Sequence, residues 1–135
     1  MRYGICIWNF YAETTTLPEL VHEFADMGFD AASFTTAQLR TLPPDEVQAA
    51  ATAARDRDVA VTLHGNFEID VAEVLGFVET FASSLLTVTC DAAMTTDSRG
   101  RFHDPARMAP FLGAVLAATE GTEERVGVEE FPLDD

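Results

Sequence analysis

His64 and Glu129 each combine a reactive side chain with a position where an apolar strand pattern ends. His64 closes the run "VAVTLH", and Glu129 follows "RVGV". An imidazole at such a point is a candidate metal ligand, general acid/base or hydrogen-bond donor to a substrate oxygen. A carboxylate there is a candidate ligand for a divalent cation, or a base that moves a proton at carbon. The alternatives are a core histidine satisfied by backbone groups and a solvent-facing carboxylate in an acidic protein.

Polar or aromatic side chains also follow the other expected strands. They are Trp8 with Asn9, Thr35 with Thr36, Asn66, and Cys90 with Asp91. In parallel α/β folds ligands gather at the carboxyl ends of the strands, so we take Trp8, Asn66 and Asp91 as candidate substrate-binding residues. Cys90 is a weaker candidate because a thiol nucleophile needs a base beside it, and the sequence indicates none.

Strand and helix patterns alternate along the chain. Short apolar runs predict strands, the first of them buried on both faces. Helical spacing of apolar residues, a capping box at Thr16 and Glu19 with a stop at Gly28, and Asp104 before Pro105 predict the helices. The expected strands cover residues 3–10, 29–36, 59–67, 84–90 and 125–131, and the expected helices cover residues 17–27, 43–57, 71–81 and 105–120.

This order, β-α-β-α-β-α-β-α-β, predicts an α/β fold with a parallel sheet and right-handed crossovers. We expect one domain over residues 1–135. Two architectures fit: a five-stranded flavodoxin-like open sheet, and the first half of an eight-fold β/α barrel, which needs about 250 residues when complete. The first β-α turn, "NFYAETTT", lacks the glycines of a phosphate-binding loop, which counts against the open sheet.

The chain is strongly acidic, with a formal net charge of −15 and eight basic residues, all of them arginine. A disordered acidic chain would lack apolar residues, whereas 47% of this one is hydrophobic. We therefore expect a folded protein adapted to high salt, where carboxylate repulsion is screened within about 3 Å at 1 M ionic strength. The acidity disfavours nucleic acid as a partner only weakly.

Cys6 and Cys90 lie far apart, with no CxxC motif or histidine cluster, so reduced thiols and a cytoplasmic location are expected. The N-terminus, "MRYGICIW", has no signal-peptide pattern. No apolar run approaches the roughly 18 residues of a membrane span.

The segments "VTLHGNF" and "VGVEEFP" resemble the third and fifth strands of the xylose-isomerase-like sugar phosphate isomerase/epimerase superfamily, whose fifth strand reads roughly G-V-E-N-H-P. Gly127, Val128, Glu129 and Pro132 match that string, and Glu130 and Phe131 depart from it. The opening "RYGICIW" is also similar to the start of that family.

The resemblance implies the N-terminal half of a TIM-type barrel that stops after strand five. It also implies that Glu129 is a metal ligand and proton-transferring base, and that His64 contacts metal or substrate. The expected cofactor is a divalent metal (Mn, Mg, Co or Zn), whose other ligands would come from strands six to eight. One carboxylate cannot hold Mg²⁺ or Mn²⁺ tightly, because such ions take about six ligands.

Three functions remain open. The first is a metal-dependent sugar or sugar-phosphate isomerase or epimerase, incomplete and inactive by itself. The second is a zinc enzyme on the same fold, similar to the type-IV apurinic endonucleases, which would want a basic groove. The third is a non-catalytic half-barrel that self-associates through the exposed edges of its first and fifth strands.

Overall fold

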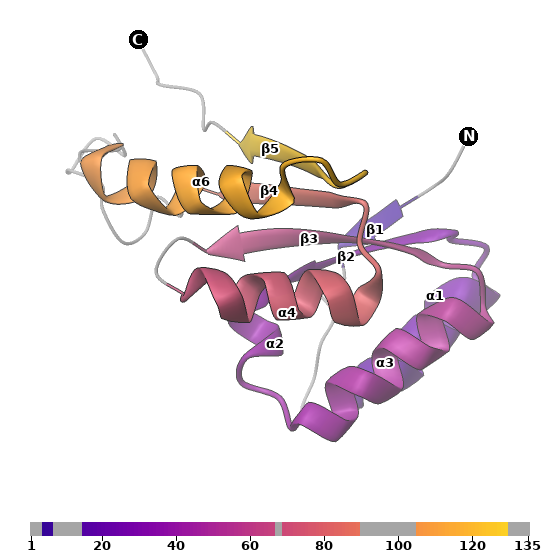
Figure 1. Cartoon of the computed structure of the whole chain (residues 1–135). Helices are drawn as coiled ribbons and strands as arrows, with labels where there is room; N and C mark the ends of the chain where they lie inside the picture. The colour runs from indigo at the N-terminus through magenta and orange to yellow at the C-terminus, as the bar shows by residue number, and fades with distance from the viewer. Residues whose placement is uncertain (1–3, 7–14, 67–68, 90–104, 130–135) are drawn as a thin grey trace, which may run out of the picture.

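A computed structural model describes residues 4–6, 15–66, 69–89 and 105–129. Strands and helices alternate along this part of the chain (Figure 1). The strands are β1 (Gly4–Cys6), β2 (Ala31–Thr35), β3 (Ala60–Asn66), β4 (Leu85–Thr89) and β5 (Arg125–Glu129). The helices are α1 (Leu17–Asp26), α2 (Thr36–Leu39), α3 (Pro44–Asp56), α4 (Val71–Phe81) and α6 (Pro105–Thr119).

The five strands form one parallel sheet in the order β1-β2-β3-β4-β5. A flavodoxin-like sheet has the order 2-1-3-4-5 and reverses its winding direction once. In this sheet each strand is added on the same side as the one before. The structure therefore confirms the predicted α/β class and excludes the open flavodoxin-like alternative, because the winding direction never reverses.

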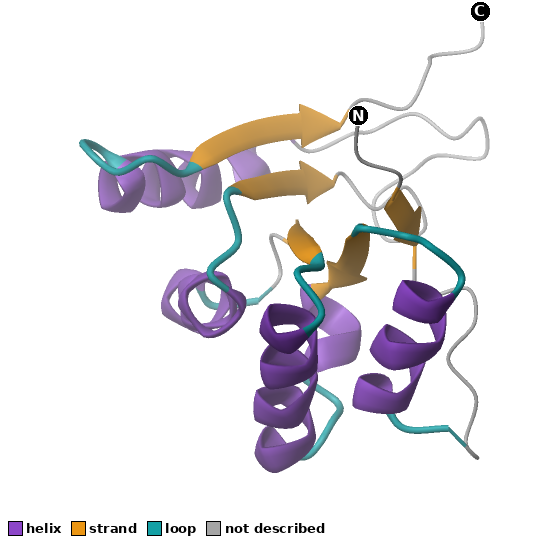
Figure 2. Cartoon of the chain, turned by 90° about the vertical axis from the view of Figure 1, so that its right-hand side faces the viewer, coloured by secondary structure: helices purple, strands orange, loops and turns teal. Residues whose placement is uncertain are grey.

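Successive crossovers of one hand in one direction place all the connecting helices on the same face of the sheet. Figure 2 shows the described helices along the outer side of a curved sheet, and none of them covers the opposite face. A singly wound sheet of this kind has a helix-covered outer face and a second face that becomes the interior when a barrel closes.

The core lies between the sheet and its helices. Exposure alternates along β3, where Val61, Leu63 and Gly65 are buried and the residues between them are half-buried. A strand alternates its side chains between two faces, so the buried set points toward the helices and the other set toward the open face. All four residues of the predicted apolar stripe of α1 are buried: Leu17, Leu20, Val21 and Phe24.

The helix ends follow the local chemistry that the sequence predicted. At the start of α1 the Glu19 carboxylate accepts hydrogen bonds from the backbone N–H and the hydroxyl of Thr16, each at 2.9 Å. At its end Gly28 has φ +92°, and the Phe29 N–H donates to the Phe24 carbonyl at 3.0 Å. A residue with a Cβ adopts that φ only with strain, so glycine is required here.

Two expectations about the first strands are wrong. The second strand ends at Thr35, and residues 36–39 form the short helix α2 instead. The Thr35 hydroxyl caps this helix by accepting from the Gln38 N–H at 3.2 Å, so the sequence signal was the spacing T-x-x-Q. The described part of the first strand is not buried on both faces, since Gly4 and Cys6 are exposed. The reason is that β1 is an edge strand with its open face uncovered by described residues.

Within the described residues, no helix is long and apolar enough to cross a membrane.

Candidate functional site

His64 lies on the open face of the sheet, near the carboxyl end of β3. The strand register places Thr35, His64, Thr87 and Gly127 in one row across β2, β3, β4 and β5. Glycine at the β5 position leaves this row uncrowded, because a Cβ built there would meet only the Thr87 hydroxyl, at 3.8 Å. His64 is half-buried, so its imidazole is both held by the fold and within reach of a ligand.

Glu129 and Asn66 lie one step further toward the carboxyl edge. The register pairs Asn66 with Thr89 and Thr89 with Glu129. Because strand side chains repeat every two residues, this row shares a face with the row of His64. Strands β3 and β5 are separated by one strand, which is about 9–10 Å in the hydrogen-bonding direction. The fold thus brings these three sequence-predicted positions to one edge of one face.

The structure describes the backbone of Glu129 but not its side chain. Trp8 and Asp91, the other candidate substrate-binding residues, lie outside the described residues. Their proposed roles remain predictions.

Thr36 is a site residue that the sequence did not single out beyond its place at a strand end. Its side chain is fully buried. Its hydroxyl donates to the backbone carbonyl of His64 at 3.2 Å and accepts from the backbone N–H of Asn66 at 3.1 Å. One hydroxyl therefore holds the backbone on both sides of Gly65. These partners lie 28 and 30 residues away, which is why no local pattern indicated the contact.

A second polar contact lies on the open face, closer to the middle of the strands. The Thr62 hydroxyl donates to the Ser33 hydroxyl at 2.9 Å, and these residues are register partners on β3 and β2. Ser33 is buried although it is polar. On the amino-terminal side of His64, the hydroxyl groups of Thr62 and Ser33 thus satisfy each other on this face.

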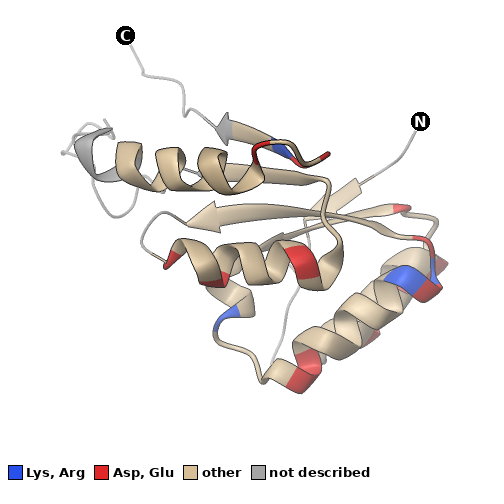
Figure 3. Ribbon diagram, in the orientation of Figure 1, with Lys and Arg blue, Asp and Glu red and all other residues tan. Residues whose placement is uncertain are grey.

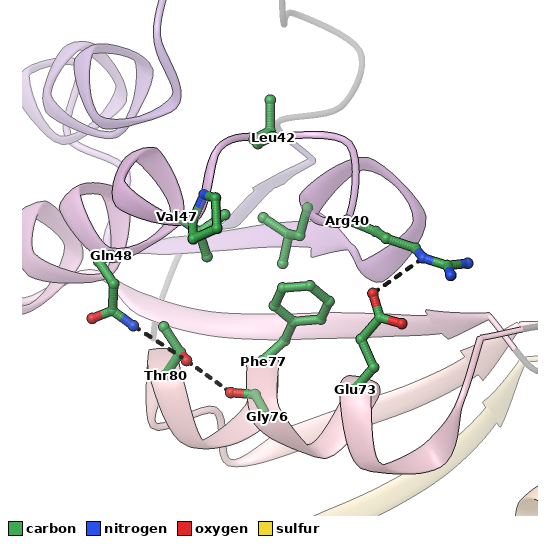
Figure 4. A pocket seen from close by; sticks show the side chains of 10 residues that line it. Arg40, Leu42, Val47, Gln48, Glu73, Gly76, Phe77 and Thr80 are labelled. Carbon is green, nitrogen blue, oxygen red and sulfur yellow. Dashed lines mark hydrogen bonds and ion pairs between the residues drawn. The ribbon is translucent and has the colours of Figure 1, made fainter.

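A groove of about 370 Å³ lies elsewhere, among α2, α3 and α4 in the helix layer (Figure 4). Its apolar lining includes Leu42, Val47 and Phe77. At one end Arg40 forms an ion pair with Glu73 at 3.1 Å. The groove lies on the outer side of the sheet, so it does not adjoin the row of His64.

A divalent metal would have to be held by side chains in the described part of the chain or beyond it. No group of three or more His, Cys, Asp or Glu side chains in that part of the chain could hold a metal ion. A tightly held Mg²⁺ or Mn²⁺ takes several protein ligands. The described side chains by themselves therefore do not make a metal centre. The side chain of Glu129, the ligand that the resemblance implied, lies outside them, so the divalent metal stays a prediction.

Comparison with known proteins gives a fold but no sequence relative. No protein-family model matches the chain, and no curated protein matches it either. Among solved structures, the probable 3-DHS dehydratase AsbF of Bacillus anthracis superimposes with a TM-score of 0.68 at 10% identity. The match covers 98% of this chain and 53% of that one.

Two sugar epimerases match in the same way. A D-psicose 3-epimerase determined in the presence of D-fructose gives a TM-score of 0.64 at 14% identity. The D-psicose 3-epimerase of Clostridium cellulolyticum, determined with D-tagatose, gives 0.63 at 14% identity. Each match covers 93% of this chain and 51% of the epimerase.

The fold is that of a partial TIM barrel. The chain spans about half the length of the structures it matches. The singly wound sheet and the one-sided helix layer are the physical basis of the match, and the resemblance noted in "VTLHGNF" and "VGVEEFP" agrees with it at the level of the fold.

Proposed function

We propose that this partial TIM barrel carries the first half of a sugar isomerase or epimerase site, in which a proton moves beside a carbonyl group. The observation that carries the proposal is the placement of His64, Asn66 and Glu129 on one face, at the carboxyl edge of the sheet. This edge is where β/α barrels hold their active sites. Two of the matched structures are epimerases of a sugar, which supports a sugar as the substrate class.

In this proposal Glu129 is the base that accepts a proton from carbon. His64 and Asn66 donate hydrogen bonds to substrate oxygens and orient the carbonyl group. A carboxylate close to a carbon acid is effective when its basicity matches the working pH and its geometry is fixed. His64 is half-buried on a regular strand, and this position would help to hold the substrate carbonyl in a fixed orientation toward the base.

A divalent metal would polarise the carbonyl oxygen when bound, but the described residues do not supply a ligand set for it, so no step is derived through it. A sugar phosphate in place of a sugar, adaptation to high salt, a cytoplasmic location, inactivity of the chain alone and self-association through strand edges remain predictions.

The apurinic-endonuclease alternative finds no support in the charge distribution of the described residues. Figure 3 shows the Asp and Glu positions on several helices and turns, with few Lys or Arg positions among them. A protein that binds DNA neutralises phosphates with clustered Lys and Arg.

The test is exchange of substrate hydrogen for deuterium. The chain is incubated with D-fructose in D₂O, with and without added Mn²⁺, and the sugar C–H signals are followed by NMR. Because the chain carries only half of the site, we expect no epimerised product. We do expect slow exchange of a substrate hydrogen, which Glu129→Gln reduces by at least about tenfold, the scale of a lost general base. The matched control is Glu130→Gln, which removes the neighbouring carboxylate and should exchange at the wild-type rate.

Binding is tested separately from exchange. The ring signals of His64 should shift on addition of D-fructose, whereas those of His22, which is exposed on α1, should not. Exchange that is unchanged in Glu129→Gln would contradict the proposed base. If the ring signals of His64 do not shift at millimolar D-fructose, the proposed site is contradicted.

A further inference from the structure

The contact of Thr36 with β3 occurs where β2 stops being a strand. The last pair of the β2–β3 ladder is Thr35 with His64. Thr36 would pair with Gly65, but it is already the first residue of α2. The backbone of Thr36 has therefore turned away from β3 at the point where the carboxyl edge begins.

The Thr36 side chain replaces the missing backbone pairing. In a parallel ladder, a residue facing Gly65 would donate its N–H to the carbonyl of residue 64 and accept from the N–H of residue 66. The Thr36 hydroxyl makes the same two bonds, to the His64 carbonyl at 3.2 Å and from the Asn66 N–H at 3.1 Å. A single hydroxyl, both donor and acceptor, thus extends the ladder by one step.

Gly65 is held tightly from the helix side. A Cβ built on it would lie 3.1 Å from Cδ1 of Leu86 and 3.6 Å from Cγ1 of Val74. Both neighbours are buried. The end of β3 is therefore fixed laterally by Thr36 and from behind by α4 and β4, while the side chains of His64 and Asn66 belong to the open face.

We propose that Thr36 is a positioning residue: its buried hydroxyl keeps the end of β3 extended and so fixes the directions in which His64 and Asn66 leave the sheet. The two hydrogen bonds of the Thr36 hydroxyl go to their backbone groups, so it acts through them and not on a ligand. The inference rests on the proposed function only where it assumes that His64 binds the substrate. The geometry that it assigns to Thr36 is independent of any reaction.

The test compares two substitutions at this position in the full chain. Thr36→Val keeps the shape of the side chain and removes the hydroxyl, whereas Thr36→Ser keeps the hydroxyl. In Thr36→Val we expect the Asn66 amide to exchange with solvent at least about tenfold faster, because its hydrogen-bond acceptor is gone. We also expect the ring signals of His64 to shift. In Thr36→Ser the exchange rate of the Asn66 amide should stay within about threefold of wild type, and the ring signals of His64 should stay at their wild-type positions.

Ser83→Ala is the matched control for a merely structural effect. The Ser83 hydroxyl is also buried, and it lies 3.0 Å from the Val61 carbonyl oxygen and 2.9 Å from that of Leu85, at the opposite end of the sheet. This variant should lower stability and leave the Asn66 amide and the His64 ring as in wild type.

Three results would overturn the inference. The first is a Thr36→Val protein whose Asn66 exchange and His64 ring signals match wild type. The second is a Ser83→Ala protein that changes them as much as Thr36→Val does, and the third is a Thr36→Ser protein that restores neither. Failure of the sugar-exchange test would leave these measurements unaffected, so the two proposals fail separately.

Discussion

At the scale of single residues, the carboxyl end of β3 depends on two residues that act on its backbone, Thr36 through hydrogen bonds and Gly65 through its small size. Thr36 supplies a donor and an acceptor to two backbone groups in a place that no solvent reaches. Gly65 has no side chain, and this leaves room for Leu86 and Val74, which pack close to its backbone. Such positions are predicted poorly by periodicity, because threonine and glycine are common in turns and strands alike.

Gly65→Ala should destabilise the protein by about 1 kcal/mol, because the added methyl group overpacks a buried site where the nearest carbon is 3.1 Å away. Urea unfolding followed by circular dichroism measures the change. The control is Gly113→Ala on α6, where nothing lies within 4 Å of the added Cβ. That helix-interior change should stabilise the protein by about 0.5–1 kcal/mol. Equal effects of the two substitutions would show that the space behind β3 is not limiting.

At the scale of elements, the helices are fixed largely by their own ends and stripes. The start of α1 shows this most clearly, because the Glu19 carboxylate accepts from both polar groups of Thr16. These bonds favour the ionised carboxylate and hold the pKa of Glu19 below its usual value. By contrast, α2 is too short to show a helical period, and the sequence analysis did not predict it. Its capping pair, Thr35 and Gln38, is the local signal that could have done so.

Glu19→Gln should make the stability of α1 less dependent on pH. A lowered pKa in the folded state stabilises the protein above the unfolded pKa of about 4.3, and this stabilisation is lost as pH falls through the folded pKa. The variant should therefore be less stable than wild type at pH 7, and the difference should shrink toward pH 3. Urea titrations across this range measure it.

Glu23→Gln, an exposed change on the same helix, is the control for altered net charge. A difference between Glu19→Gln and wild type that stays constant from pH 7 to pH 3 would contradict the role of the ionised cap.

At the scale of the whole molecule, charge and topology act separately. The formal net charge of −15 determines how the protein responds to salt, but it does not determine the fold. The one-directional strand order decides that the helices lie outside and that His64 and Asn66 share the other face. Ion pairs do little to offset the acidity, since the exposed pairs Arg40–Glu73 and Arg57–Asp26 belong to a class that contributes about 0–1 kcal/mol each.

Raising NaCl from 0.05 M to 0.5 M should raise the melting temperature steeply, because the screening length falls from well above 10 Å toward a few ångströms and self-repulsion weakens. Further addition to 3 M should have a smaller effect if screening is the cause. Differential scanning fluorimetry measures the curve, with sucrose at matched osmolality as the uncharged control. A melting temperature independent of NaCl below 0.5 M would contradict electrostatic repulsion as a major destabilising factor.

The sequence by itself determined the alternation of strands and helices, the apolar stripe of α1, and the strand-end positions of His64 and Glu129. These features depend on residues a few places apart, whose spacing and capping chemistry act locally. Only the tertiary structure decided the strand order, and with it the barrel-type winding over the open sheet. It alone brought Thr36 to the end of β3 and joined Ser33 to Thr62, because these contacts connect residues 28 to 30 places apart through the register of neighbouring strands. Register is set by packing across the whole sheet, and no local spacing in the chain encodes it.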